Sequence, residues 1–190
     1  VVSMGRAKHQ NALVSSMGSA ADVALHGFPF CRASGYLLRM AKLYFHYATM
    51  NAGKTTMLLQ ASYNYRERGM STMLFVAGHY SRGDSAGYVS SRIGLEAEAE
   101  MFRDGDDLFA RISGRHRNNP VHCVFVDEAQ FLQEEQVWQL ARVADREHIP
   151  VMCYGLRTDF QGNLFSGSRA LLAIADELRE VRTICRCGRK

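Results

Sequence analysis

The chain has 190 residues, of which 47% are hydrophobic and 22% charged. This composition indicates one folded domain and argues against a disordered protein. No apolar run approaches the roughly 20 residues that a membrane-spanning helix needs, so we expect no membrane partner. The net charge of +4 divides into +3 for residues 1–40 and +1 for residues 41–190. A nearly neutral body argues against a nucleic-acid partner.

Residues 1–40 show no lasting hydrophobic period and are rich in Ser, Gly and Ala. We expect a disordered N-terminal extension. A weak targeting peptide is one alternative, because the stretch contains Arg and almost no acid. Another alternative is a start-site artefact, with the natural chain beginning at Met40.

From residue 43 onward, short apolar segments alternate with helical patterns. We predict strands at residues 43–47, 72–77, 121–126, 150–155 and 180–185. We predict helices from Lys54 to a stop at Gly69, at 133–148 and at 166–178. Residues 78–90 read as a loop, and residues 94–102 and 105–119 as helical or turn-like. This order predicts an α/β fold with a mostly parallel sheet flanked by helices.

The segment YATMNAGKTTMLLQ at residues 47–60 matches the phosphate-loop pattern G-x-x-x-x-G-K-[ST], except that Ala48 holds the first position. A strand before the loop and a helix after it are the context that this motif needs. Lys54 would reach the β- and γ-phosphates, and the Thr55 hydroxyl would bind Mg²⁺. Lys54 is also the only lysine between residues 43 and 189. The alternative is a helix N-terminus that contains GKT by chance.

Two adjacent carboxylates, Asp127 and Glu128, follow the apolar segment 121–126. Ligands of doubly wound sheets lie at the carboxyl ends of the strands. Asp127 is therefore placed to hold Mg²⁺, and Glu128 to take a proton from an attacking hydroxyl or water. An acid pair that only favours a helix N-terminus is the alternative.

The cysteines do not suggest a disulfide framework, because Cys123 and Cys153 lie inside apolar runs where free cysteine behaves as a small hydrophobe. Together with the lack of a clear signal peptide, this favours a reducing, cytoplasmic setting.

The chain resembles the zinc-containing, RecA-like thymidine kinases, a family that includes bacterial enzymes and cytosolic enzymes of animals. It resembles the enterobacterial type most closely. The similar stretches are LYFHYATMNAGKTTMLLQASYNYRERGM, VSSRIGL, VHCVFVDEAQFL, IPVMCYGLRTDFQGNLFSGS and TICRCGRK, which together cover most of residues 41–190. The resemblance implies a RecA-like P-loop fold and ATP-dependent phosphorylation of thymidine at its 5′-hydroxyl. It also implies a homotetramer.

The resemblance assigns the general base to Glu128. It implies that ATP is bound by Ala48, Thr49, Met50, Asn51, Ala52, Gly53, Lys54, Thr55, Asp127, Glu128, Ala129 and Gln130. It implies that thymidine is bound by Met50, Phe131, Leu156, Phe160, Phe165 and Thr183. The residues themselves also place aromatics in a loop just past a strand, where a base can stack, although such phenylalanines are more often core residues.

Three features depart from the family pattern. Ala48 is a small replacement for Gly, and it requires an ordinary backbone conformation at the start of the loop. Tyr80 and Ser81 stand where relatives carry acids. The Arg82 that follows is retained and would stabilise charge on the transferred phosphoryl group. Asp84 is a candidate substitute for the missing acid, and a weakened Mg²⁺ shell is the other possibility.

The third departure is the ending, where Cys185 and Cys187 match the first half of the family's structural zinc site. A tetrahedral site needs four ligands, and the family supplies the second pair about 35 residues later, across a lasso loop over thymidine. We therefore expect domain boundaries at 1–40, 41–184 and 185–190, the last being the start of an incomplete zinc and lasso domain. Either the sequence is a fragment, or the lid and half the zinc site are absent.

Three functions stay open at this point. The first is an active thymidine kinase, and the second is a truncated, weakly active or inactive nucleotide-binding remnant of that family. The third is a RecA-like ATPase that acts on DNA. The near-neutral body and the phenylalanines of the expected thymine pocket argue against it.

Overall fold

The computed structural model describes residues 41–78, 87–183 and 188. A six-stranded sheet runs through the domain in the order β5-β2-β6-β7-β1-β8. Its strands are β1 (Leu43–Ala48), β2 (Thr72–Ala77), β5 (Glu100–Phe102), β6 (Cys123–Val126), β7 (Val151–Leu156) and β8 (Glu177–Glu180). Every neighbouring pair is parallel, which confirms the predicted sheet type.

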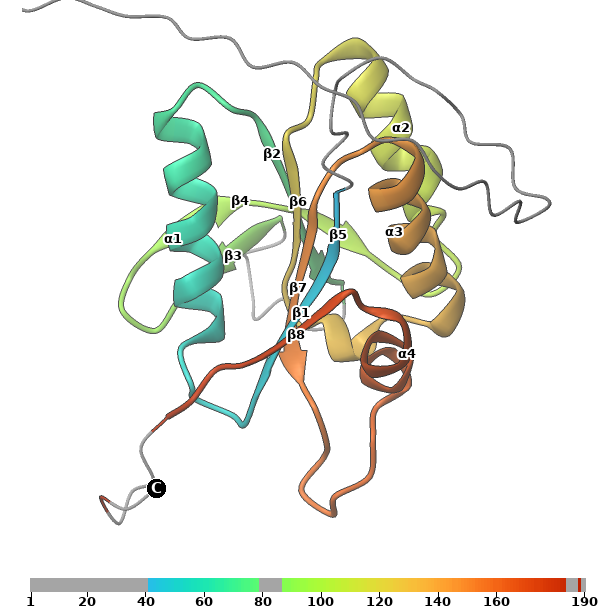
Figure 1. Ribbon diagram of the computed structural model, residues 1–190. Helices are drawn as coiled ribbons and strands as arrows, with labels where there is room; N and C mark the ends of the chain where they lie inside the picture. The colour runs from blue at the N-terminus through green and yellow to red at the C-terminus, as the bar shows by residue number, and fades with distance from the viewer. Residues whose placement is uncertain (1–40, 79–86, 184–187, 189–190) are drawn as a thin grey trace, which may run out of the picture. The chain divides into compact units, whose positions relative to one another are not determined.

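Helices cover both faces of this sheet (Figure 1). They are α1 (Lys54–Glu67), α2 (Leu108–Asn118), η1 (Ala129–Phe131), α3 (Glu134–Arg146) and α4 (Ser166–Ile174). Helix α1 lies on one face, and α2, α3 and α4 lie on the other (Figure 1). Among the described helices, none is both long and apolar enough to span a membrane.

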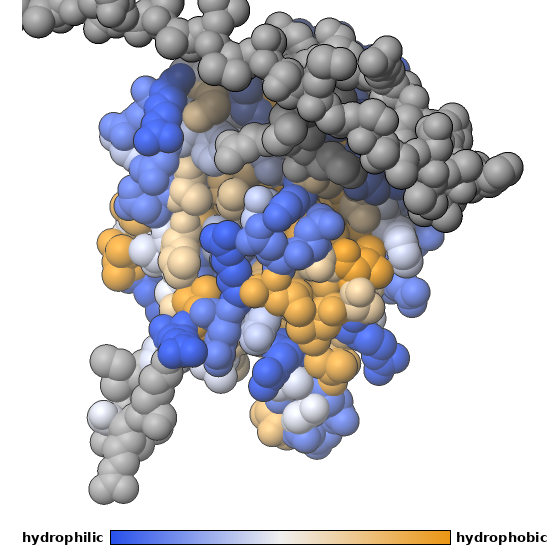
Figure 2. Space-filling view, in the orientation of Figure 1, coloured by the Kyte–Doolittle hydropathy of each residue, from blue (hydrophilic) through white to orange (hydrophobic). Residues whose placement is uncertain are grey.

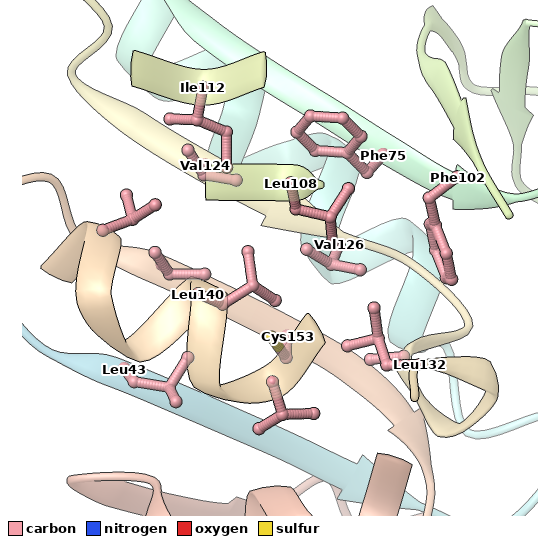
Figure 3. Packing of buried hydrophobic residues seen from close by; sticks show 14 of the residues in the cluster. Leu43, Phe75, Phe102, Leu108, Ile112, Val124, Val126, Leu132, Leu140 and Cys153 are labelled. Atoms are coloured by element: carbon pink, nitrogen blue, oxygen red, sulfur yellow. The ribbon is translucent and has the colours of Figure 1, made fainter. Parts of the chain in front are cut away.

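The larger core lies between the sheet and the three helices α2, α3 and α4 (Figure 3). Strand residues Leu43, Phe75 and Val126 meet helix residues Ile112 and Leu140 there, and all five are buried. A smaller core beneath α1 contains Leu58, Phe125 and Tyr154. Because central strands are buried on both faces, they read as continuous apolar runs, and this pattern made them predictable.

The end of α1 confirms the role that the sequence predicts for Gly69. Gly69 has a φ of 72°, a left-handed conformation that glycine adopts without steric cost. Its N–H donates to the Arg66 carbonyl, and the Met70 N–H donates to the Tyr65 carbonyl. These two bonds form a Schellman motif, which ends the helix.

Residues 94–102, which we predicted to be helical or turn-like, form two short strands instead. Strand β4 (Glu96–Glu98) pairs antiparallel with β3 (Tyr88–Ser90), and β5 pairs with β2. Ala97 is buried while Glu96 and Glu98 are exposed, so burial follows a period of two. The prediction was wrong because the alternation of side chains outweighs the helix propensity of Ala and Glu. The predicted loop at 78–90 is also too long, since its last three residues belong to β3.

The C-terminal strand lies earlier than predicted. Helix α4 ends at Ile174 and not at residue 178, and β8 occupies Glu177–Glu180 in place of the predicted 180–185. Asp176 sets this register, because its N–H donates to the Leu43 carbonyl and its carboxylate accepts from the Leu43 N–H at 2.7 Å. The chain is thereby held beside β1 before β8 begins.

Candidate active site

The predicted phosphate loop joins β1 to α1 at the carboxyl edge of the sheet (Figure 1). Ala48 is the buried last residue of β1, so its extended backbone confirms the ordinary conformation expected there. The left-handed conformations fall instead on Asn51, with a φ of 65°, and on Gly53, with a φ of 79°. Replacing Gly by Ala at position 48 therefore leaves the turn of the loop intact.

Lys54 begins α1, and its side chain folds back over the loop. Its Nζ donates to the Thr49 carbonyl at 2.9 Å, and the residue is buried. Burial lowers the pKa of the Lys54 ammonium below its ordinary value, while the charges of Glu128 and Asp127 partly offset this effect. The loop therefore holds a shielded cation close to two carboxylates.

Thr55 and Asp127 join the two halves of the predicted nucleotide site. The Thr55 Oγ1 donates to the Asp127 Oδ2 at 2.9 Å, across 72 positions of the sequence. Burial, and secondly the neighbouring Glu128 charge, raise the pKa of Asp127 to about 6, while the Thr55 hydrogen bond opposes the rise. A hydroxyl and a carboxylate side by side are the oxygen donors that Mg²⁺ prefers.

This donor pair fits a Mg²⁺ ion that takes its remaining ligands from water and phosphate oxygens. Within the described ranges, no group of three or more His, Cys, Asp and Glu side chains forms a metal site. Thr55 and Asp127 suit a metal that arrives with a nucleotide.

The raised pKa of Asp127 predicts a pH-dependent stability. The folded carboxyl has a pKa of about 6 against an ordinary 3.8, so its contribution is favourable below about pH 4 and is lost as pH rises through 6. Asp127→Asn cannot ionise, so its free energy of unfolding relative to wild type should increase between pH 4 and pH 8. The shift corresponds to an increase of up to about 3 kcal/mol. Urea unfolding of both proteins at the two pH values measures this difference.

Hydrogen bonds that Asn fails to reproduce cost the same at both pH values, so they cancel in the comparison. Asp127 accepts such bonds from the Thr55 hydroxyl and from the Glu128 N–H at 3.1 Å. An equal difference in stability at pH 4 and pH 8 would contradict the assignment of a buried, raised carboxyl.

Glu128 follows Asp127 in a left-handed conformation, with a φ of 53°. Such a conformation is uncommon for a residue other than glycine and is found at functional sites. The Glu128 Oε2 accepts a hydrogen bond of 2.6 Å from the Gln130 Nε2. The Gln130 Oε1 in turn accepts from the Leu156 N–H at 2.9 Å, at the end of β7. The carboxylate is thus connected to the neighbouring strand end.

A cavity of about 400 Å³ opens at this strand end. Four of the residues that the resemblance assigns to thymidine line it, namely Met50, Leu156, Phe160 and Phe165. Phe131, a fifth, packs edge to face against Phe165 with ring centroids 5.9 Å apart. In Figure 2, hydrophobic side chains gather over the region of α4, next to the loop that follows β7. The cavity is therefore suited to a partly apolar ligand.

The loop after β7 is ordered by its own polar groups. The Asp159 carboxylate accepts from the backbone N–H groups of Gln161 and Asn163, each at 2.8 Å. These hydrogen bonds, those of Asn163 foremost, lower the pKa of Asp159. The turn presents Phe160 at its tip, where the side chain is 95% exposed. Phe160 is therefore a surface residue beside the cavity and not a core residue, whereas Phe165 is half-buried.

Some predicted site residues are not brought together by the structure. Thr183 is exposed and is not among the residues that line the cavity, so its place beside the base stays a prediction. Arg82, Tyr80, Ser81, Asp84, Cys185 and Cys187 lie outside the described residues, as does the 1–40 extension.

Sequence reasoning missed several residues that line the cavity, namely Tyr47, Arg157, Thr158, Asp159 and Glu180. Arg157 lies over the Tyr47 ring, with its guanidinium carbon 5.6 Å from the ring centroid. Arg157, Thr158 and Asp159 belong to the segment LRTDF, of which only Leu156 and Phe160 were singled out. Glu180 carries no such signal, because it reaches the cavity only through the pairing of β8 with β1.

Comparisons with known proteins identify the family of the chain. A family model described as thymidine kinase matches residues 41–190. A thymidine kinase of Mesorhizobium japonicum is 85% identical over 151 residues, covering 80% of this chain and 74% of that protein. Thymidine kinases of Agrobacterium fabrum and Ruegeria pomeroyi are 66% and 65% identical over the same length, and the chain covers 78% and 76% of them. The chain belongs to the thymidine kinase family.

Proposed function

We propose that this protein transfers the γ-phosphoryl group of ATP to the 5′-hydroxyl of thymidine, giving ADP and thymidine monophosphate. One observation carries the proposal. The Glu128 carboxylate accepts a hydrogen bond from Gln130, which is itself hydrogen-bonded to Leu156 in the lining of the cavity. The adjacent Asp127 accepts a hydrogen bond from Thr55 at the end of the phosphate loop. This arrangement supports a role for Glu128 as a proton acceptor between a nucleotide site and a nucleoside site.

Each residue has a distinct part in this transfer. Loop N–H groups and the Lys54 ammonium would bind the phosphates of ATP and stabilise charge on the phosphoryl group as it moves. The Glu128 carboxylate would accept the proton of the 5′-hydroxyl. The 5′-oxygen then bonds to the γ-phosphorus as the bond between that phosphorus and the β–γ bridging oxygen breaks, and ADP leaves with this oxygen.

Mg²⁺ held by Thr55 and Asp127 would neutralise charge on the phosphate oxygens. The base would be held by the side chains of Met50, Leu156, Phe160 and Phe165. Phe131 packs against the Phe165 ring. Because thymidine is uncharged, apolar contacts with its base would supply much of its binding and would thereby position its sugar.

We add four further proposals. The cysteine usage supports a cytoplasmic protein. The resemblance supports the other three, of which the first is that the protein assembles as a homotetramer. Cys185 and Cys187 supply two thiolates to a structural zinc site. Arg82 acts on the transferred phosphoryl group.

The test is a transfer assay with labelled ATP, Mg²⁺ and thymidine, in which labelled thymidine monophosphate is separated from free phosphate. The matched control is 5′-deoxythymidine, which has the same base and lacks only the accepting hydroxyl. We expect labelled nucleotide with thymidine and none with the control. Release of phosphate at equal rates with both nucleosides, without labelled nucleotide, would show an ATPase and overturn the proposal.

A further inference from the structure

We propose that Gln130 is a positioning residue, which fixes the Glu128 carboxylate relative to the wall of the nucleoside cavity. This inference rests on the proposed function, because it assigns the geometry of the proposed base to one amide side chain. The resemblance places Gln130 among the residues that bind ATP, and the structure points to a different task.

The orientation of the Gln130 amide follows from its partners. The Leu156 N–H is a donor only, so the atom 2.9 Å away must be the amide oxygen. The Glu128 carboxylate accepts hydrogen bonds when ionised, so the atom 2.6 Å from it must be the amide nitrogen. Reversing the amide would place two donors together and two acceptors together. The bridge therefore exists in one orientation only.

The surroundings leave the amide no room to move. Gln130 is 1% exposed. A Cβ added at Gly155 would lie 2.8 Å from the Gln130 Oε1 and 3.0 Å from its backbone nitrogen. On the other side, a Cβ added at Gly167 would lie 3.0 Å from the Gln130 carbonyl and 2.5 Å from that of Ala129. Two glycines thus let β7 and α4 close tightly around this residue, which fixes the bridge.

This burial separates positioning from direct ATP binding. Both polar atoms of the Gln130 side chain have partners inside the protein, one at the proposed base and one at a residue that lines the cavity. A side chain in this situation orients the groups that it joins. Its loss should reduce the rate of transfer and leave the affinity for ATP unchanged.

The experiment compares Gln130→Met with Gln139→Met. Methionine keeps the length of the side chain and removes both hydrogen bonds. Gln139 is a matched control, because it is also buried and its Oε1 accepts from the Leu108 N–H at 2.8 Å, at the start of α2. We expect Gln130→Met to lower kcat for thymidine phosphorylation by about 10- to 100-fold, as a misplaced reacting group does. The KM for ATP should change by less than about twofold, and Gln139→Met should retain kcat.

A second measurement shows whether Gln130 acts through Glu128. In a Glu128→Gln background, Gln130→Met should lower the remaining kcat by less than about twofold, because the group that it positions is already gone. Hydrogen exchange of the Leu156 amide should accelerate in Gln130→Met and not in Gln139→Met. This readout needs no activity and tests the bridge itself.

The outcomes separate the inference from the proposed function. An active wild type whose kcat survives in Gln130→Met overturns the positioning role and leaves the kinase assignment standing. So does a raised KM for ATP with unchanged kcat, which would make Gln130 an ATP-binding residue. If Gln130→Met lowers kcat as strongly in the Glu128→Gln background as in wild type, Gln130 acts independently of the base and the positioning role is overturned. A wild type that phosphorylates no thymidine overturns the proposed function and the inference that rests on it.

Discussion

Replacing Glu128 with Gln is expected to lower kcat for thymidine phosphorylation by about 10²- to 10⁴-fold, which is the usual contribution of a general base. The substitution keeps the size of the side chain and removes its ability to accept a proton. The Gln130 amide, 2.6 Å from the Glu128 carboxylate, and the left-handed backbone of Glu128 fix the position of this carboxylate. We therefore expect no other carboxylate to replace it as proton acceptor. Steady-state transfer rates at saturating ATP and thymidine measure the effect.

The Glu134→Gln variant is the matched control for this change. Glu134 is exposed in the first turn of α3 and is not among the residues that line the cavity, so its substitution removes one negative charge and leaves the cavity lining unchanged. We expect it to retain wild-type kcat. ATP binding by Glu128→Gln, measured by calorimetry, should stay within about threefold of wild type, because a transition-state interaction is lost and not a ground-state one. Retention of wild-type kcat in Glu128→Gln would exclude Glu128 as the base.

The nucleotide half of the site was predictable because its geometry is local. Gly53, Lys54 and Thr55 follow one another directly, and the strand before them and the helix after them are enough to orient them. Asp127 was predictable for a related reason, since adjacent parallel strands bring their carboxyl ends to one edge. The 2.9 Å contact between Thr55 and Asp127 confirms that the two sequence segments meet.

The nucleoside half depends on contacts that no short stretch of sequence encodes. Glu180 reaches the cavity through strand pairing, and Arg157 through its position over Tyr47. The aromatic residues themselves gave an ambiguous signal, because burial cannot be read from residue type. Phe160 is nearly fully exposed, whereas Phe131 is half-buried against the core. Only the turn formed by Asp159 places Phe160 in an exposed position at the rim of the cavity.

The fold shows the same division between local and distant causes. The central strands β1, β2, β6 and β7 were predicted within two residues at either end, because burial on both faces leaves continuous apolar runs. The edge strands β5 and β8 were missed or displaced. Their exposed faces carry Glu and Arg, and their positions depend on the pairing partner more than on their own composition.

Replacing Lys54 with Met should lower kcat by about 10²- to 10³-fold, the usual cost of removing one preorganised group that stabilises developing charge. Methionine retains the length of the side chain and removes the ammonium. The structure shows why another cation cannot compensate. Lys54 is buried within its own loop and bonded to the Thr49 carbonyl at 2.9 Å, so the space fits a compact charge. Lys54→Arg should therefore also lose activity, because a planar guanidinium is larger and spreads its charge.

Lys42→Met is the control, since Lys42 is exposed and its ion pair with Glu177 at 2.9 Å lies on the surface. Solvent screens a surface pair of this kind, so its loss has little effect on the fold and wild-type kcat is expected. Thermal unfolding of each variant identifies any loss of activity that comes from loss of fold. Wild-type kcat in Lys54→Met would mean that the loop N–H groups bind the phosphates without the ammonium.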